Sequence, residues 1–253
     1  MIYYVLKEFK GLALMINKVE EAIKYLNKGQ NQKAIDILEE LLQEDPDNKN
    51  AIYNLGLAYN NIKDSKRAID LLTSYIDNYE ENENVLAGLG YAYFLNKENK
   101  KAKDILERAY RLYPDSVYVL RNYGAVLSEL KEYKKGIEAF NKALLIDPMD
   151  HKSLIGLGII YFRTDDYGKA ENNFLQVIAL SVNDYDRSVT KSYLTKIAEK
   201  RLKGKGVRYD AVMYILSALS HYTKMGTEDI KKITFEIGML GQSGLDIGLG
   251  HWG

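Results

Sequence analysis

The sequence contains no cysteine among its 253 residues, and it has only three histidines, three prolines and one tryptophan. Without cysteine the chain has no disulfide, no thiolate nucleophile and no thiolate-bound zinc. This absence is consistent with a reducing compartment. The only histidines available as bases are His151, His221 and His251. We therefore expect neither a catalytic centre nor a cofactor.

Net charge is also missing, because the 35 lysine and arginine residues balance the 35 aspartate and glutamate residues. A neutral chain has no overall field that attracts nucleic acid or an anionic membrane. No stretch approaches the roughly 18 apolar residues of a membrane span. The first apolar run stops at Lys7, and no small-residue cleavage site follows it. These features predict a cytoplasmic protein that binds neither nucleic acid nor a membrane.

What the sequence does contain is a repeat. Glycines recur at an interval of 34 residues, and a second series of small residues and a third series of prolines recur in step with them. Glu80 replaces proline at one position of the third series. The three series are Gly56, Gly90, Gly124 and Gly158; Ala34, Ala68, Ala102, Gly136 and Ala170; and Pro46, Pro114 and Pro148. A fixed period of this size indicates a solenoid of stacked supersecondary units.

Each repeat has the pattern of two amphipathic helices. In the third repeat, apolar residues recur every three or four positions on both sides of a turn at residues 96–99. Pro114 ends the second helix, because proline does not continue a helix that precedes it. Glycine inside a helix costs about 1 kcal/mol relative to alanine, so its recurrence needs a reason. We interpret Gly90 and Ala102 as the point where the two helices cross closely.

This pattern resembles the tetratricopeptide repeat, a helix–turn–helix unit of the same length. The matching residues are Ala22, Tyr25, Ala34 and Pro46 in the first repeat; Leu55-Gly56-Leu57-Ala58-Tyr59 and Ala68 in the second; Leu89-Gly90-Tyr91-Ala92-Tyr93, Ala102, Ala109 and Pro114 in the third; Tyr123-Gly124, Gly136, Phe140, Ala143 and Pro148 in the fourth; and Leu157-Gly158, Tyr161, Ala170 and Phe174 in the fifth. The resemblance implies an all-α fold, a right-handed α-solenoid.

Five contiguous repeats are expected over residues 15–184, at 15–48, 49–82, 83–116, 117–150 and 151–184. Residues 1–14 are interpreted either as a short flexible leader or as an extended start ahead of Met15. A capping helix is predicted over residues 185–203, with Val189, Tyr193, Ile197 and Leu202 on one face. A C-terminal helical pair over residues 204–241 follows, and residues 242–253 read as a flexible glycine-rich tail.

The first helix of each repeat is expected to line a concave groove. The side of these helices away from the glycines is rich in amides and aromatic rings. Asparagine both donates and accepts hydrogen bonds, so it can pair with an extended peptide backbone, and aromatic rings offer apolar area. The predicted groove residues are Tyr53, Asn54, Asn60, Asn61, Tyr91, Phe94, Tyr118, Arg121, Asn122, Lys152, Phe162 and Arg163. Asn54 and Asn122 would clamp the backbone. The alternative is that these residues merely cover the helix flanks.

The other motifs give weaker indications of function. A subset of the family binds acidic chaperone C-termini through lysine, asparagine and arginine, but Val19 and Ile23 stand at two of those places here, which argues against that activity. Ser243 lies in a Gly-Gln-Ser-Gly segment without a positioned histidine. Asp45 and Asp47 form a turn without the glycine and distal glutamate of a calcium loop. The basic residues from Lys196 to Lys205 read as a solvated face.

We therefore predict a noncatalytic adaptor that holds a protein or peptide segment in the groove. A second hypothesis is an accessory subunit, in which residues 204–253 dock on an enzyme while the repeats bind a signal peptide. The partner, the pathway and the oligomeric state do not follow from the sequence.

Overall fold

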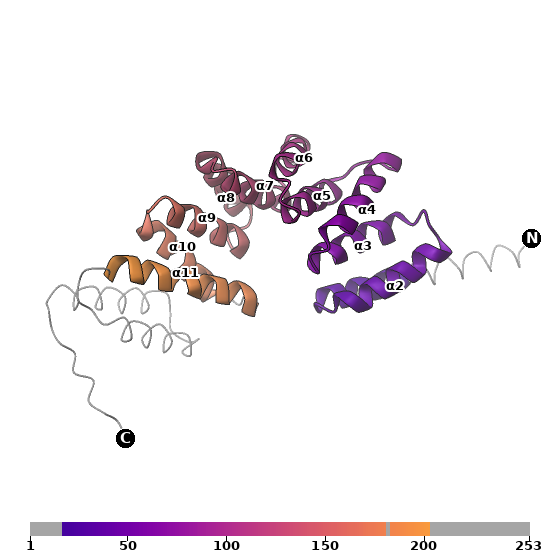
Figure 1. Ribbon diagram of the computed structural model, residues 1–253, viewed down its shortest axis with the longest axis horizontal. Helices are drawn as coiled ribbons and strands as arrows, with labels where there is room; N and C mark the ends of the chain where they lie inside the picture. The colour runs from indigo at the N-terminus through magenta and orange to yellow at the C-terminus, as the bar shows by residue number, and fades with distance from the viewer. Residues whose placement is uncertain (1–16, 181–182, 203–253) are drawn as a thin grey trace, which may run out of the picture. The chain divides into compact units, whose positions relative to one another are not determined.

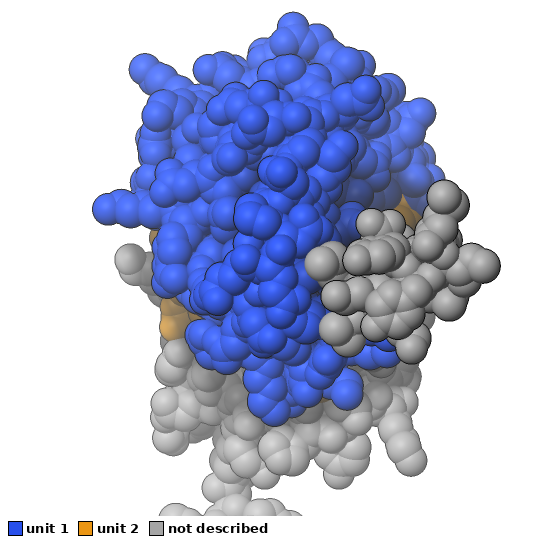
Figure 2. Space-filling model, turned by 90° about the vertical axis from the view of Figure 1, so that its right-hand side faces the viewer, with its two compact units in different colours: residues 1–146 blue, residues 147–253 orange. Residues whose placement is uncertain are grey.

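The computed structural model describes residues 17–180 and 183–202, and every regular element in these ranges is an α-helix (Figure 1). The chain divides into two compact units, residues 1–146 and 147–253 (Figure 2). The leader at residues 1–14, the helical pair at 204–241 and the tail at 242–253 all lie outside the described residues.

The first unit consists of antiparallel helix pairs. Residues 17–27 form a helix, followed by α2 (Asn31–Glu44), α3 (Lys49–Asn61), α4 (Ser65–Asn78), α5 (Glu83–Leu95), α6 (Asn99–Leu112), α7 (Val117–Glu129) and α8 (Tyr133–Ile146). Each helix from α2 to α7 packs against the next one along the chain. In addition, α3 packs against α5 and α5 against α7. The first helices of successive pairs therefore lie side by side in one layer.

The second unit contains α9 (His151–Arg163), α10 (Tyr167–Ala179) and α11 (Asp184–Leu202). α11, which covers most of the range predicted for the capping helix, packs against both α9 and α10. Its inner face differs in part from the expected one. Ile197 is buried as predicted, but Thr190 and Leu194 are the other buried residues, while Val189 and Tyr193 are only half-buried. The side chain of Leu202 is outside the described part of the structure.

Polar side chains begin most of these helices. At each of six helix starts, the residue before the helix accepts a hydrogen bond from a backbone N–H in the first turn, which would otherwise lack a partner within the helix. These capping residues are Asn48, Asp64, Asn82, Ser116, Asp150 and Asp166. The helix starts Lys49, Glu83, Val117 and His151 are again 34 residues apart. Because capping residues recur with the 34-residue period of the sequence, the helices begin with the same period in the structure.

The turn inside each pair uses a left-handed residue. Lys63, Lys97, Lys131 and Asp165 have φ near +60°, and Gly29 has φ of 70° at the corresponding place in the first pair. In the second pair, the N–H of Lys63 donates to Asn60 and the N–H of Asp64 donates to Tyr59. These two hydrogen bonds form the Schellman ending of a helix. The turn is therefore the same in every pair, although only the first one has glycine there.

Glycine at these lysine positions is expected to stabilise the protein. A left-handed conformation is strained for residues with a Cβ atom, and glycine relieves that strain while losing more chain entropy on folding. We expect Lys63→Gly, Lys97→Gly and Lys131→Gly each to raise the free energy of unfolding by about 0.5 kcal/mol. The control Glu138→Gly, in the middle of α8, should lower it by about 1 kcal/mol. Urea unfolding measures both, and a loss of stability in the lysine variants would contradict the strain argument.

The recurring glycines receive a large side chain from the second helix of their pair. A Cβ atom on Gly56 would lie 2.7 Å from Leu72, and one on Gly90 would lie 2.4 Å from Leu106. Phe140 and Phe174 take the same place over Gly124 and Gly158. The close contact predicted at the glycines is therefore real, and the side chain nearest to Gly90 is that of Leu106, which the sequence had not indicated. Leu106, one turn further along α6, rests on Gly90, while Ala102 is buried in a cluster with Leu106, Tyr123 and Leu127.

Candidate functional site

The layer made by α3, α5 and α7 presents one surface that the second helices do not cover, and we call it the α3–α5–α7 face. The first helices contact one another, whereas α4, α6 and α8 pack mainly against first helices. Most of the sequence-predicted groove residues lie on these three helices.

Aromatic rings from all three helices gather on this face. Tyr53 comes from α3, Tyr91 and Phe94 from α5, and Tyr118 from α7, and all four are half-buried. The rings of Tyr91 and Phe94 stack with centroids 6.3 Å apart. Half-buried aromatic rings keep apolar area available to a second molecule while packing fixes their position. The structure thus brings together the aromatic residues that the sequence predicted in this unit.

Tyr53 of α3 and Tyr118 of α7 lie close enough for the second phenol to affect the pKa of the first. Burial raises the pKa of Tyr53 well above its ordinary value, and Tyr118 and Glu83 raise it further. Burial also raises the pKa of Tyr118, although Arg121 and a hydrogen bond with Asn122 act in the opposite direction. Both phenols are therefore neutral at physiological pH, and each can donate and accept a hydrogen bond.

Arg121 is the cation of this cluster. Its guanidinium lies 4.8 Å from the centroid of the Tyr118 ring, a cation–π distance. It also lowers the pKa of Tyr118, as expected of a positive charge beside a phenol. The side chain is half-buried. Arg121 is therefore held at a defined place rather than extended into solvent.

The four asparagines differ in what they already bind. Asn60 is almost fully buried and its amide donates to the Gly88 carbonyl of α5 at 3.0 Å. The amide of Asn122 donates to the Ala87 carbonyl of the same helix at 3.4 Å. Asn60 and Asn122 thus join α3 and α7 to α5. Asn54 donates to the Asn50 carbonyl within its own helix at 2.8 Å.

Asn61 stands apart from the face, because it is exposed and its amide donates to the Asn31 side chain at 3.0 Å. The remaining predicted residues belong to the second unit. There Phe162 packs its ring against Tyr167 and Tyr193, with centroids 5.8 and 5.2 Å away. Lys152 and Arg163 are exposed. These three residues are described within their own unit only.

The structure also contains a repeated polar cluster near the turns that was not predicted from the sequence. Arg67 lies 4.3 Å from the Tyr59 ring centroid and pairs with Asp64 at 2.6 Å. The same tyrosine, carboxylate and cation recur at Tyr93, Glu98 and Lys101 and at Tyr161, Asp166 and Lys169. The 34-residue spacing of these residues was a signal that could have revealed them. The fourth pair has Leu127 in place of tyrosine.

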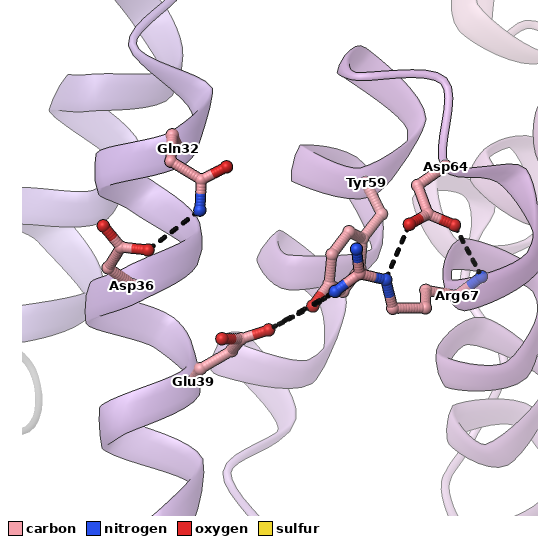
Figure 3. A network of polar contacts seen from close by, with 6 residues as sticks. All are labelled: Gln32, Asp36, Glu39, Tyr59, Asp64 and Arg67. Carbon is pink, nitrogen blue, oxygen red and sulfur yellow. Dashed lines mark hydrogen bonds and ion pairs between the residues drawn. The ribbon is translucent and has the colours of Figure 1, made fainter.

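In the second pair this cluster also reaches the preceding helix (Figure 3). The hydroxyl of Tyr59 donates to Glu39 on α2, and Arg67 donates to the Tyr59 hydroxyl at 3.1 Å. Burial and the hydrogen bond to Glu39 raise the pKa of Tyr59. Beside it, Gln32 bonds Asp36 within α2. These contacts join α2, α3 and α4, so their role is structural.

The described residues contain no group of three or more potential metal ligands. His151 is the first of the three histidines in the sequence. Its Nε2 atom lies 3.0 Å from Asp186 Oδ2, so it links the starts of α9 and α11. His221, His251 and Ser243 lie outside the described ranges. None of the helices that the structure describes is long and apolar enough to span a membrane.

Comparison with models of known protein families agrees with the observed repeat of helix pairs. Tetratricopeptide repeat models match residues 25–87, 86–116 and 120–149. The chain belongs to the tetratricopeptide repeat family. The fold is accordingly an all-α repeat solenoid, and it is that of a protein-interaction scaffold. A search of curated proteins found no match.

Solved structures of tetratricopeptide repeat proteins resemble the chain. TTC0263, a thermophilic protein of this family from Thermus thermophilus, has a TM-score of 0.65 at 18% identity over 71% of this chain and 98% of its own. A MamA structure has a TM-score of 0.50 at 26% identity over 62% and 92% of the two chains. MamA from Desulfovibrio magneticus RS-1 has a TM-score of 0.53 at 23% identity over 65% and 93%.

Proposed function

We propose that this tetratricopeptide repeat protein is an adaptor whose α3–α5–α7 face holds an extended segment of a partner protein. The observation that carries the proposal is the gathering of Tyr53, Tyr91, Phe94 and Tyr118 from three neighbouring helices. Helices pack about 8–10 Å apart, so an extended segment of about six residues would cross all three.

The asparagines supply the polar part of the proposed contact. An amide group has two N–H donors and a carbonyl acceptor, and the bonds of Asn54 and Asn122 to Asn50 and Ala87 each use one donor. Asn122 also shares a hydrogen bond with Tyr118, and Asn54 is only 8% exposed, so a partner backbone would use the amide groups that these contacts leave. Asn60 takes a different part, because its amide is buried between helices and supports the face. The cytoplasmic location and the accessory-subunit role of residues 204–253 stay predictions.

The double variant Asn54→Ala/Asn122→Ala tests the clamp. The probe is a set of peptides of about 12 residues, long enough to cross the face, selected from a random display library on the full chain. Losing two hydrogen bonds of about 1 kcal/mol each should weaken their binding roughly 10- to 30-fold. The matched control is Asn78→Ala, because Asn78 also donates to a carbonyl of its own helix at 2.8 Å but lies on α4. Unchanged affinity in the double variant, or equal losses in both variants, would reject the clamp.

A further inference from the structure

Charge is distributed unevenly between the two helix layers of the first unit. The only charged residues in α3, α5 and α7 are Lys49, Glu83, Arg121 and Glu129. α6 alone carries Lys100, Lys101, Lys103, Asp104, Glu107, Arg108 and Arg111. Lys49 and Glu83 begin their helices and Glu129 ends α7, so Arg121 is the one charge in the interior of the layer that these helices form.

Apolar side chains occupy the middle of the same layer. Leu57, Tyr91, Phe94, Leu95 and Ala125 are each half-buried. Residues left half-exposed on a helix are ordinarily interspersed with charged ones, as they are on the second helices. Here the helix ends are charged and the middle is apolar and amide-rich. An apolar and nearly uncharged surface of this kind is typical of a binding site.

This composition determines which side chains of a partner would bind favourably on the face. A charged side chain of a partner placed over Leu57, Tyr91 or Phe94 would lose its hydration without gaining a counter-charge. An apolar side chain placed there would gain by leaving water. Arg121 could serve one carbonyl or carboxylate of the partner, but its guanidinium is already stacked on Tyr118.

Resting on the proposed function, we infer that the partner segment is uncharged and apolar over the part that crosses α5. Its binding is driven by apolar burial on Leu57, Tyr91 and Phe94 and by backbone hydrogen bonds, and ion pairing contributes little. The α3–α5–α7 face therefore selects against segments that carry charge over the part that crosses α5.

The selected peptides and charge-insertion variants test this inference. Enriched peptides should lack charge in their central residues, and their Kd should change by less than about twofold between low and high salt, because screening acts on charge pairs. Tyr91→Asp and Tyr91→Lys should each weaken binding roughly tenfold or more, while Tyr91→Phe should stay within about twofold. Circular dichroism verifies that each variant is folded.

Leu112→Lys is the matched control, because Leu112 is an exposed leucine, 51% accessible, at the end of α6. Binding should be unchanged in this variant. Enrichment of acidic or basic peptides that lose binding in the Tyr91 variants would overturn the inference but leave the proposed function in place. Peptides whose binding ignores Tyr91 would overturn both.

Discussion

Replacing Gly90 with alanine is expected to destabilise the protein by about 1–3 kcal/mol, the usual cost of overpacking. The new Cβ atom would lie 2.4 Å from Cγ and 2.8 Å from Cδ2 of Leu106. Leu106 is fully buried, so the new methyl group would have to displace a packed core side chain. Alanine is the better helix former by about 1 kcal/mol, but this gain is smaller than the clash. Urea unfolding followed by circular dichroism measures the difference.

Gly88→Ala is the control for this prediction, because it lies two residues away on the same helix. Its Cβ atom would be 3.4 Å from Leu72 and 3.5 Å from Leu57, which are ordinary contact distances. We expect this variant to match the wild type or to gain up to about 1 kcal/mol. Adding Leu106→Ala to Gly90→Ala should cost less than the sum of the two single changes, because the two residues touch. Strict additivity would show that Leu106 is not what opposes the new methyl group.

Phe174→Ala is expected to cost about 3–5 kcal/mol within the second unit. Phe174 is completely buried and its ring lies against Gly158, where a Cβ atom would be 2.6 Å away. It also stacks on Tyr193 of α11, with ring centroids 5.2 Å apart. Removing the ring therefore leaves a cavity between α9 and α10 and removes a contact that holds the capping helix. Amide hydrogen exchange in α11 should accelerate along with the fall in unfolding free energy.

The milder change Phe174→Leu separates the cavity from the general loss of an aromatic ring. Leucine occupies the equivalent place over Gly56 and Gly90, as Leu72 and Leu106. We expect a loss of about 1–2 kcal/mol, from the smaller volume and the missing stack on Tyr193. A loss as large as that of Phe174→Ala would mean that leucine does not fill this position as it does in the first unit.

The glycine contacts also show how much of the helix packing the 34-residue periodicity predicts. The spacing of Gly56, Gly90, Gly124 and Gly158 correctly predicted close packing at every glycine. It gave Ala102 as the point where the helices cross, and it gave no sign that the side chain of Leu106 covers Gly90. These two residues are four positions apart on one helix and share a face, so a pattern of spacings gives no reason to prefer one. The crossing of α5 and α6 and the direction of the leucine side chain decide it.

In the candidate site too, some features follow from the sequence and others only from the packing of the helices. The sequence placed Tyr53, Tyr91 and Tyr118 on neighbouring first helices, because the repeat length assigns each residue to a face. It gave no sign that Asn60 and Asn122 donate to carbonyls of α5. Those bonds join residues 28 and 35 positions apart, and they depend on how far one helix is shifted along the next.

Composition and local pattern thus suffice for the helices, their turns, the family and the near absence of charge on α3, α5 and α7, since each of these depends on residues close together in the chain. Helix packing was needed to establish which leucine or phenylalanine rests on each glycine, which asparagines are engaged and which rings meet. The reason is that contacts between helices depend on their relative rotation and shift, and many residues far apart in the chain set these together.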